Sequence, residues 1–315
     1  MMDAQLVIGA GPVGTRTALL LAEAGERVRM VTRSGSGPEH PGVERIAADA
    51  SDAATMRTLA SGAGVIYNCA NPAYVRWDTD WPPIADALLE AAASSGAVLA
   101  TVSNLYGYGA VRGPISPDTP LAPNDRKGEV RARMWTDALE AHQSGRVRVV
   151  EVRASDYADA GANSHLARNA PAVLAGKTVW ALGGADQPHS WTTTHDTARL
   201  LIDVAKDAGA HGEAWLVPSA PPRSQRGALG DLAAVAGVAA PKVRVLGPSA
   251  LRAVGVFVPL FRELAGTAYQ FTAPFVIDHT HTVNRFGWEP QDWQETLARV
   301  VEAARGATAP VASRP

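Results

Sequence analysis

The chain has 315 residues, a formal net charge of −2 and a hydrophobic content of 46%, which is ordinary for a globular protein. This length allows one large α/β domain, or a domain with a smaller lobe, and the weak charge argues against nucleic acid or an acidic membrane as a partner. The single cysteine, Cys69, excludes a disulfide within the chain, and no apolar run is long enough to span a bilayer. Because no secretion signal precedes the first strand, the sequence predicts a cytoplasmic protein.

The first predicted element is a short apolar strand that runs directly into a glycine turn and a helix. The turn has the spacing Gly-x-Gly-x-x-Gly: Gly9 lets the chain turn, Gly11 lets a pyrophosphate approach, and Gly14 lets the helix pack against the strand. Pro12 and Val13 open the helix, whose free N–H groups attract phosphate. This stretch predicts a dinucleotide-binding site.

The second predicted strand, at 27–32, leads to a position that indicates which dinucleotide binds. An NAD site has an acidic residue about 20 residues past the glycines, where it accepts hydrogen bonds from the ribose 2′-hydroxyl. This chain has Arg33 there, and unless Arg33 is a solvated loop residue, its guanidinium can bind a 2′-phosphate. Arg16, early in the first helix, is a candidate for a second cation. The sequence therefore predicts NADP(H) in preference to NAD(H).

Strand and helix patterns then alternate through the first half of the chain. Further strands are predicted at 43–47, 64–70, 97–102 and 147–152, with helices around Met56 and Leu59, after Asp80, and over 129–142. This repeated order predicts an α/β fold, a Rossmann-type doubly wound parallel sheet with right-handed crossovers.

Beyond residue 155 prolines and glycines become more frequent, which predicts a smaller C-terminal substrate lobe. We expect a dinucleotide-binding domain over 1–155, to which 183–206 returns, and a substrate-binding lobe over 156–306. Helices are expected near 223–237, 249–265 and 292–305, followed by a mobile tail at 307–315.

Several segments resemble blocks of one family in the same order along the chain. They are Asp49-Ala50, Asn68-Cys69-Ala70-Asn71, Ser103 to Gly109, Arg153 to Tyr157, His189 to Ala198 and Phe286 to Pro290. Together they resemble the extended or atypical short-chain dehydrogenases/reductases, of the NAD-dependent epimerase/dehydratase kind. The resemblance implies that Asp49 and Ala50 contact adenine, that Ala70 and Asn71 cover the cofactor, and that the protein pairs through helices as a homodimer.

The chain departs from this family at its catalytic residues. The family uses Tyr-x-x-x-Lys on a helix, where the ammonium lowers the tyrosine pKa, and a serine on the preceding strand. Here Lys127 and Arg131 have the same separation and fall about where the tyrosine and lysine are expected. If Tyr108-Gly109 matches the family's Tyr-Gly, Asn104 takes the serine position, with Ser103 just before it. The group that transfers the proton is therefore open.

Three interpretations follow from this departure. Lys127 could act as the base beside Arg131 and a cationic nicotinamide. Tyr106 or Tyr108 could instead donate the proton, with Arg131 lowering its pKa. In the third interpretation, Lys127 and Arg131 only hold cofactor ribose or phosphate, or lie on a solvated face, and no proton transfer accompanies redox chemistry.

The sequence as a whole favours an NADP(H)-dependent oxidoreductase or epimerase/dehydratase-like enzyme. Its expected partner is a small carbonyl, hydroxyl or sugar-like substrate, and no metal site is expected. The alternative from another class is a catalytically inactive dinucleotide-binding regulator or sensor. A flavoprotein monooxygenase shares the glycine pattern, but Arg33 replaces the acidic residue that its FAD ribose requires.

Overall fold

The computed structural model describes residues 4–308, and within them seven parallel strands form one large sheet in the order β10-β6-β5-β4-β1-β2-β3. The strands of this sheet are β1 (Ala4–Ile8), β2 (Val28–Thr32), β3 (Val43–Ala47), β4 (Ala63–Asn68), β5 (Val98–Asn104), β6 (Arg148–Ala154) and β10 (Ala214–Leu216). The predicted Rossmann-type fold class is thereby confirmed. The order reverses at β1, between β2 and β4, and ligands bind at such a reversal in open α/β sheets.

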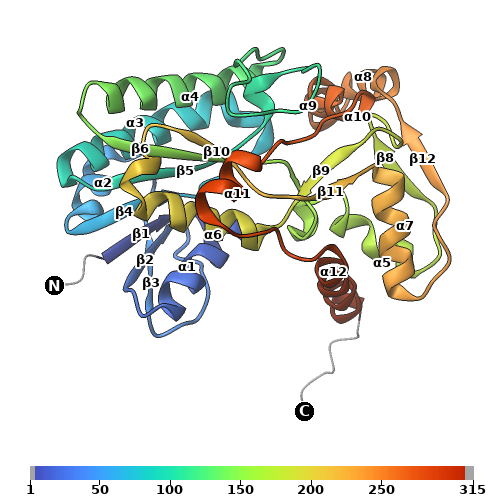
Figure 1. The fold of residues 1–315 in the computed structure, drawn as a ribbon, viewed down its shortest axis with the longest axis horizontal. Helices are drawn as coiled ribbons and strands as arrows, with labels where there is room; N and C mark the ends of the chain where they lie inside the picture. Colours follow the sequence, from blue (N-terminus) through green and yellow to red (C-terminus); the bar gives the residue numbers. More distant parts are fainter. Residues whose placement is uncertain (1–3, 309–315) are drawn as a thin grey trace.

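Helices cover both faces of the large sheet (Figure 1). One face carries α1 (Pro12–Glu23) and α6 (Thr194–Lys206), and the other carries α2 (Ala53–Ala60), α3 (Trp77–Ser95) and α4 (Arg126–Gln143). Successive residues of β1 alternate between the faces: Val7 packs in the cluster under α1 and α6, whereas Leu6 and Ile8 pack under α2, α3 and α4. The central strands are thus buried on both sides, as a parallel sheet requires.

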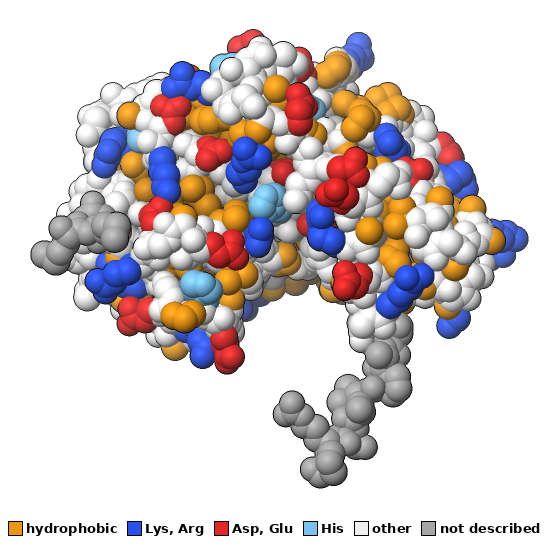
Figure 2. Space-filling view, turned by 60° about the horizontal axis from the view of Figure 1, so that its bottom comes forward, with side chains coloured by type: hydrophobic (Ala, Val, Ile, Leu, Met, Phe, Trp, Pro, Cys, Tyr) orange, Lys and Arg blue, Asp and Glu red, His pale blue; other side chains and the backbone are white. Residues whose placement is uncertain are grey.

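The C-terminal lobe lies beside the sheet, at the right of Figure 1. Its strands are β7 (Asp156–Tyr157), β9 (His189–Thr192) and β11 (Ala220–Arg223) in one small sheet, and β8 (Val179–Leu182) and β12 (Val243–Leu246) in another. Its helices include α5 (Ala170–Leu174), α7 (Gln225–Ala236), α8 (Pro248–Gly255), α9 (Pro259–Thr267), α10 (Tyr269–Thr272) and α12 (Trp293–Thr308), and α11 (Thr280–Phe286) lies before α12. Over the face in Figure 2, acidic and basic side chains are interspersed rather than gathered by sign.

The chain returns from the lobe to the large sheet through α6 and then β10. Strand β10 pairs with β6, so this return extends past residue 206 to Leu216. The sequence did not predict β10, because three residues are too few to display a strand pattern.

The structure also differs from the predicted helices at particular residues. The helix predicted over 249–265 is broken into α8 and α9, because Pro259 lacks the N–H needed to continue a helix and instead starts a new one. Helix α3 begins at Trp77 rather than after Asp80, and α12 continues to Thr308 into the predicted tail. The remainder of that tail lies outside the described residues. No helix within 4–308 is both long and apolar enough to cross a membrane.

Candidate active site

A cavity of about 1000 Å³ follows the carboxyl ends of the sheet strands and continues beneath the C-terminal lobe. The residues after β1, β2, β4, β5 and β6 line it, together with residues of α9 and α10. The predicted residues that line it are Gly9, Gly11, Pro12, Val13, Arg33, Asp49, Ala50, Ala70, Asn71, Ser103, Asn104, Tyr106 and Arg131. The predicted residues that do not are Gly14, Arg16, Tyr108 and Lys127.

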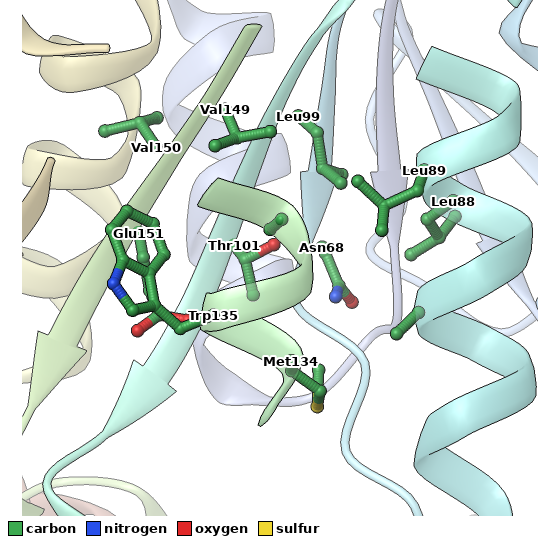
Figure 3. A pocket seen from close by; sticks show the side chains of 12 residues that line it. Asn68, Leu88, Leu89, Leu99, Thr101, Met134, Trp135, Val149, Val150 and Glu151 are labelled. Atoms are coloured by element: carbon green, nitrogen blue, oxygen red, sulfur yellow. The ribbon is translucent and has the colours of Figure 1, made fainter. Parts of the chain in front are cut away.

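A second cavity, of about 20 Å³, lies between the large sheet and helices α3 and α4 and is shown in Figure 3. Leu88, Leu99 and Trp135 are among its lining side chains, and Asn68 and Glu151 contribute polar groups. A space of this volume holds about one water molecule. The large cavity is therefore the candidate site.

The three glycines of the first turn have different surroundings. Gly9 has a φ of 97°, and Gly14 packs so closely that an added Cβ would lie 2.0 Å from the Gly9 carbonyl oxygen. An added Cβ on Gly11 would meet no atom within 4 Å, and this residue begins α1 without a side-chain cap. The first amides of α1 therefore face open space, which fits a pyrophosphate group.

Arg33 and Asp49 line the cavity just after β2 and β3. The residues after β2 that line the cavity, Arg33, Ser34 and Ser36, include no acid. Asp49 accepts hydrogen bonds from the Ser51 backbone N–H at 2.9 Å and hydroxyl at 2.8 Å, and these bonds hold its pKa below the usual range. Arg33 is exposed and is therefore free to move toward a 2′-phosphate.

Arg16 does not contribute a second cation at this position. Its Nε donates to Nδ1 of His195 at 2.9 Å, which turns the side chain toward α6 and away from the cavity. The sequence could not show this, because His195 lies 179 residues further along the chain.

Ser103, Asn104 and Tyr106 lie at the end of β5, on the opposite side of β1 from Arg33. Asn104 accepts a hydrogen bond from the Tyr106 backbone N–H at 3.1 Å, which shapes the turn that follows β5. The Tyr106 ring stacks on Trp77, and its hydroxyl lies 3.4 Å from the hydroxyl of Tyr74. Burial raises the pKa of Tyr106 well above its usual value, so the phenol keeps its proton at neutral pH.

Arg131 is a buried cation in the wall of the cavity. Its guanidinium carbon lies 4.2 Å from the Trp81 ring centre and 4.7 Å from that of Trp77, and one of its nitrogens donates to the Val102 carbonyl at 3.4 Å. Among residues 4–308 its Nε has no hydrogen-bond partner. Burial lowers its pKa to about 10, so it stays charged at neutral pH. An unpartnered buried donor of this kind fits a ligand rich in oxygen acceptors, such as a ribose.

A comparison of the sequence with known protein families agrees with a dinucleotide site at the glycine turn and the cavity. The model of the NAD dependent epimerase/dehydratase family matches residues 5–217. The chain belongs to this family. Family membership makes the protein an enzyme with a nicotinamide dinucleotide cofactor, and it gives no support to the inactive regulator that the sequence left open. No curated protein sequence matches the chain.

Solved structures of this family have the same fold over nearly the whole chain. UDP-glucose 4-epimerase from Thermotoga maritima has a TM-score of 0.79 and 17% identity, and the match covers 97% of this chain and 100% of that chain. For dTDP-glucose 4,6-dehydratase from Streptomyces venezuelae the TM-score is 0.78 and the identity 19%, with 96% and 97% covered. The dTDP-glucose 4,6-dehydratase from Bacillus anthracis has a TM-score of 0.78 and 18% identity, with 97% of each chain covered. At these identities the likeness shows the fold alone.

Lys127, which the sequence offered as a candidate base, forms an ion pair outside the cavity. Its Nζ lies 2.5 Å from Oε2 of Glu263 on α9 and 4.3 Å from the Tyr74 ring centre. Lys127 is 5% exposed, so this ion pair fastens α4 of the large domain to the lobe. The geometry therefore does not favour Lys127 as the base.

We expect the ion pair of Lys127 and Glu263 to stabilise the contact between the lobe and α4. Removing one partner leaves the other charge partly buried, so Lys127→Met and Glu263→Gln should each lower the free energy of unfolding by about 1–3 kcal/mol. The double variant should lose less than the sum of the two losses. Urea unfolding of the four proteins measures this coupling, and strictly additive losses would contradict it.

Tyr108 of this family member is also turned away from the cavity. Its hydroxyl accepts a hydrogen bond from Arg153 at 2.6 Å, and Arg153 in turn pairs with Glu151 at 2.7 Å. Tyr108 is 2% exposed and belongs to a buried network with Arg153 and Glu151 of β6. Of the two tyrosines considered as proton donors, Tyr106 alone lines the cavity.

The cavity also contains residues that sequence reasoning did not assign. Tyr74 precedes α3, and Asp156, His165 and Arg168 come from the start of the lobe. Asp156 follows a strand end within the segment Arg153 to Tyr157, so its position after β6 was the signal available. His165 lies in a turn and Arg168 in a 3-10 helix of three residues (Ala167–Asn169), and neither is long enough for a periodicity that points to a site.

Proposed function

We propose that the enzyme is an NADP(H)-dependent oxidoreductase or epimerase/dehydratase that acts on a small carbonyl, hydroxyl or sugar-like molecule. The continuity of the large cavity carries this proposal, because it runs from the open N-terminus of α1, past Arg131, to Asp156. Its volume of about 1000 Å³ is at the upper end of the roughly 300–1000 Å³ of small-molecule sites. This size supports binding of a cofactor and a substrate together.

A sugar nucleotide is the substrate class that the solved structures support. The Thermotoga maritima epimerase contains UDP-glucose, and the two dehydratases contain NAD. In this chain the exposed cation Arg168 lines the lobe end of the cavity and suits an anionic nucleotide.

Different residues of the chain are proposed to bind different parts of the cofactor and the substrate. The first amides of α1 would hold the pyrophosphate, and the Arg131 guanidinium would donate to hydroxyl groups of the adjoining ribose. When bound, the nicotinamide accepts or supplies a hydride. We assign to the protonated Tyr106 hydroxyl and the Ser103 hydroxyl, which both line the cavity at the end of β5, the orientation of a substrate oxygen.

Arg33 is expected to make NADPH bind more tightly than NADH. A charge-assisted bond to the 2′-phosphate should give NADPH an advantage of about tenfold or more, and Arg33→Ala should remove it without weakening NADH binding. Isothermal titration calorimetry with both nucleotides measures the ratio. Arg27→Ala, at the other end of β2, is the matched control and should keep the wild-type ratio. Equal affinities in the wild type would overturn the NADP(H) preference.

Turnover on a panel of UDP- and dTDP-sugars with NADP⁺ and NADPH tests the function itself. We expect substrate-dependent conversion by the purified enzyme, detected at 340 nm and by chromatography of the sugar products. Tyr106→Phe should lower kcat/KM by up to about tenfold, because it removes one orienting hydrogen bond. Absence of conversion with every sugar nucleotide in the panel, and with simple aldehydes and ketones assayed in the same way, would refute the proposal.

A further inference from the structure

Asp156, at the start of the lobe, is surrounded by side chains that carry protons. Its Oδ2 lies 2.9 Å from Nε2 of His189 on β9, and its Oδ1 lies 3.8 Å from Nε2 of His165. Arg168 contacts Nδ1 of His165 at 2.8 Å. The exposed fraction is 19% for the Asp156 side chain and 0% for that of His189, so Asp156 reaches the cavity and His189 lies behind it.

The hydrogen bonds define where the protons of the two histidines are. Arg168 can only donate, so Nδ1 of His165 accepts and its Nε2 carries the hydrogen. His189 faces the Gln270 carbonyl oxygen with Nδ1, at 3.2 Å, and the Asp156 carboxylate with Nε2. While Asp156 is ionised both of these partners are acceptors, an arrangement that fits a hydrogen on each ring nitrogen of His189, and the Ser155 hydroxyl also lies 3.4 Å from Nε2. In that arrangement His189 is a charged imidazolium beside the ionised carboxylate of Asp156, and it has one proton to give.

The surroundings of Asp156 favour this arrangement. Burial by itself would raise the pKa of Asp156, but the hydrogen bond and charge of His189, with His165 and Arg168, outweigh it and lower that pKa. Burial lowers the pKa of His165 to about 4, so His165 is neutral at pH 7. The rings of Phe271 and Phe275 stack on His189 and exclude water from it.

Asp156 comes just after the end of β6, next to the end of β5. The register pairs Asn104 with Ala154, and Asp156 comes two residues later. Asp156 also lines the cavity together with Ser103 and Tyr106. Lys127 and Arg131 fall about where the family's tyrosine and lysine are expected, so this stretch of α4 supplies no phenol for proton transfer.

We propose that Asp156 exchanges the proton with the substrate oxygen and that His189 is the positioning residue that stores this proton. This inference rests on the proposed function. In the reducing direction, a bound reduced nicotinamide would supply hydride to the carbonyl carbon, and the carbonyl oxygen would take its proton through the ionised Asp156 carboxylate, which relays it from His189. Asp156 takes the Nε2 proton of His189, which becomes neutral and keeps its Nδ1 hydrogen on Gln270. In the oxidising direction each bond change is reversed.

The protonation of His189 can be measured without any substrate. In ¹⁵N-histidine NMR spectra of the apo-enzyme at pH 7, we expect both ring nitrogens of His189 to be protonated in the wild type. In Asp156→Asn, one of them should lose its proton. Asp186→Asn, an aspartate paired with Arg226 on the surface of the same lobe, is the matched control and should leave the His189 signals unchanged. A neutral His189 in the wild type would overturn the proposal.

Catalysis supplies the second measurement, on any substrate found in the sugar-nucleotide panel. Asp156→Asn should lower kcat by about a hundredfold or more, as expected for a general acid, with little change in KM. Asp156→Glu should restore part of the rate, and Tyr106→Phe should lose far less. Wild-type kcat in a folded Asp156→Asn enzyme would refute the role. If no panel member is converted, the proposed function fails while the NMR result still decides the charge of His189.

Discussion

The Gly14→Ala variant is expected to lose much of its folding stability and, with it, dinucleotide binding. A Cβ at this position would lie 2.0 Å from the Gly9 carbonyl oxygen and 3.0 Å from the Cys69 Cβ. The nearest atom belongs to the backbone, so α1 must move away from β1 to make room. We expect a loss of about 3 kcal/mol or more, at the upper end of the cost of overpacking. Urea unfolding measures the loss.

Gly11→Ala is the matched control, because the same methyl group is added three residues earlier. Its Cβ would meet no protein atom within 4 Å, so the free energy of unfolding should stay within about 0.5 kcal/mol of the wild type. That methyl group would instead occupy the space proposed for the pyrophosphate, and NADPH affinity should fall about tenfold or more. Wild-type NADPH binding by Gly11→Ala would show that the phosphates lie elsewhere.

These two glycines illustrate which parts of the site the sequence could predict. Gly9, Gly11 and Gly14 act through neighbouring residues of one strand–turn–helix unit, so their spacing carried the information. Arg33 and Asp49 were predicted because each follows a strand, and they line the cavity because the ends of parallel strands meet along one edge of the sheet. Local pattern and the topology of a parallel sheet were sufficient for these positions.

The rest of the site depends on contacts between residues far apart in the chain. Spacing placed Lys127 and Arg131 together on one helix face, but Glu263, 136 residues after Lys127, draws the lysine into an ion pair. Tyr108 was separated from Tyr106 in the same way, by Arg153 on the next strand. No local pattern encodes such partners, whereas the break at Pro259 was visible in the sequence and should have divided the helix predicted there.

Replacing Arg131 by methionine should maintain or raise the stability of the apo-enzyme but weaken cofactor binding. Arg131→Met keeps an apolar stem against Trp77 and Trp81 but removes the charge and the unpartnered Nε. Because a buried donor without a partner costs about 1–3 kcal/mol, the apo-enzyme should become as stable as the wild type or more stable. Without the guanidinium, NADPH affinity should fall about tenfold to a hundredfold, since hydrogen bonds to charged groups contribute about 1.5–3 kcal/mol.

Thermal unfolding of apo-enzyme and calorimetric titration with NADPH measure the two effects on the same variant. Arg133→Met, two residues along α4 and largely exposed, is the control and should change neither quantity by much. If Arg131→Met destabilises the apo-enzyme by several kcal/mol and leaves NADPH affinity unchanged, Arg131 is a structural cation and its unpartnered nitrogen does not bind the cofactor. If it stabilises the apo-enzyme and lowers the affinity for NADPH, Arg131 makes the apo-enzyme less stable but binds the ligand, a combination that is common at functional sites.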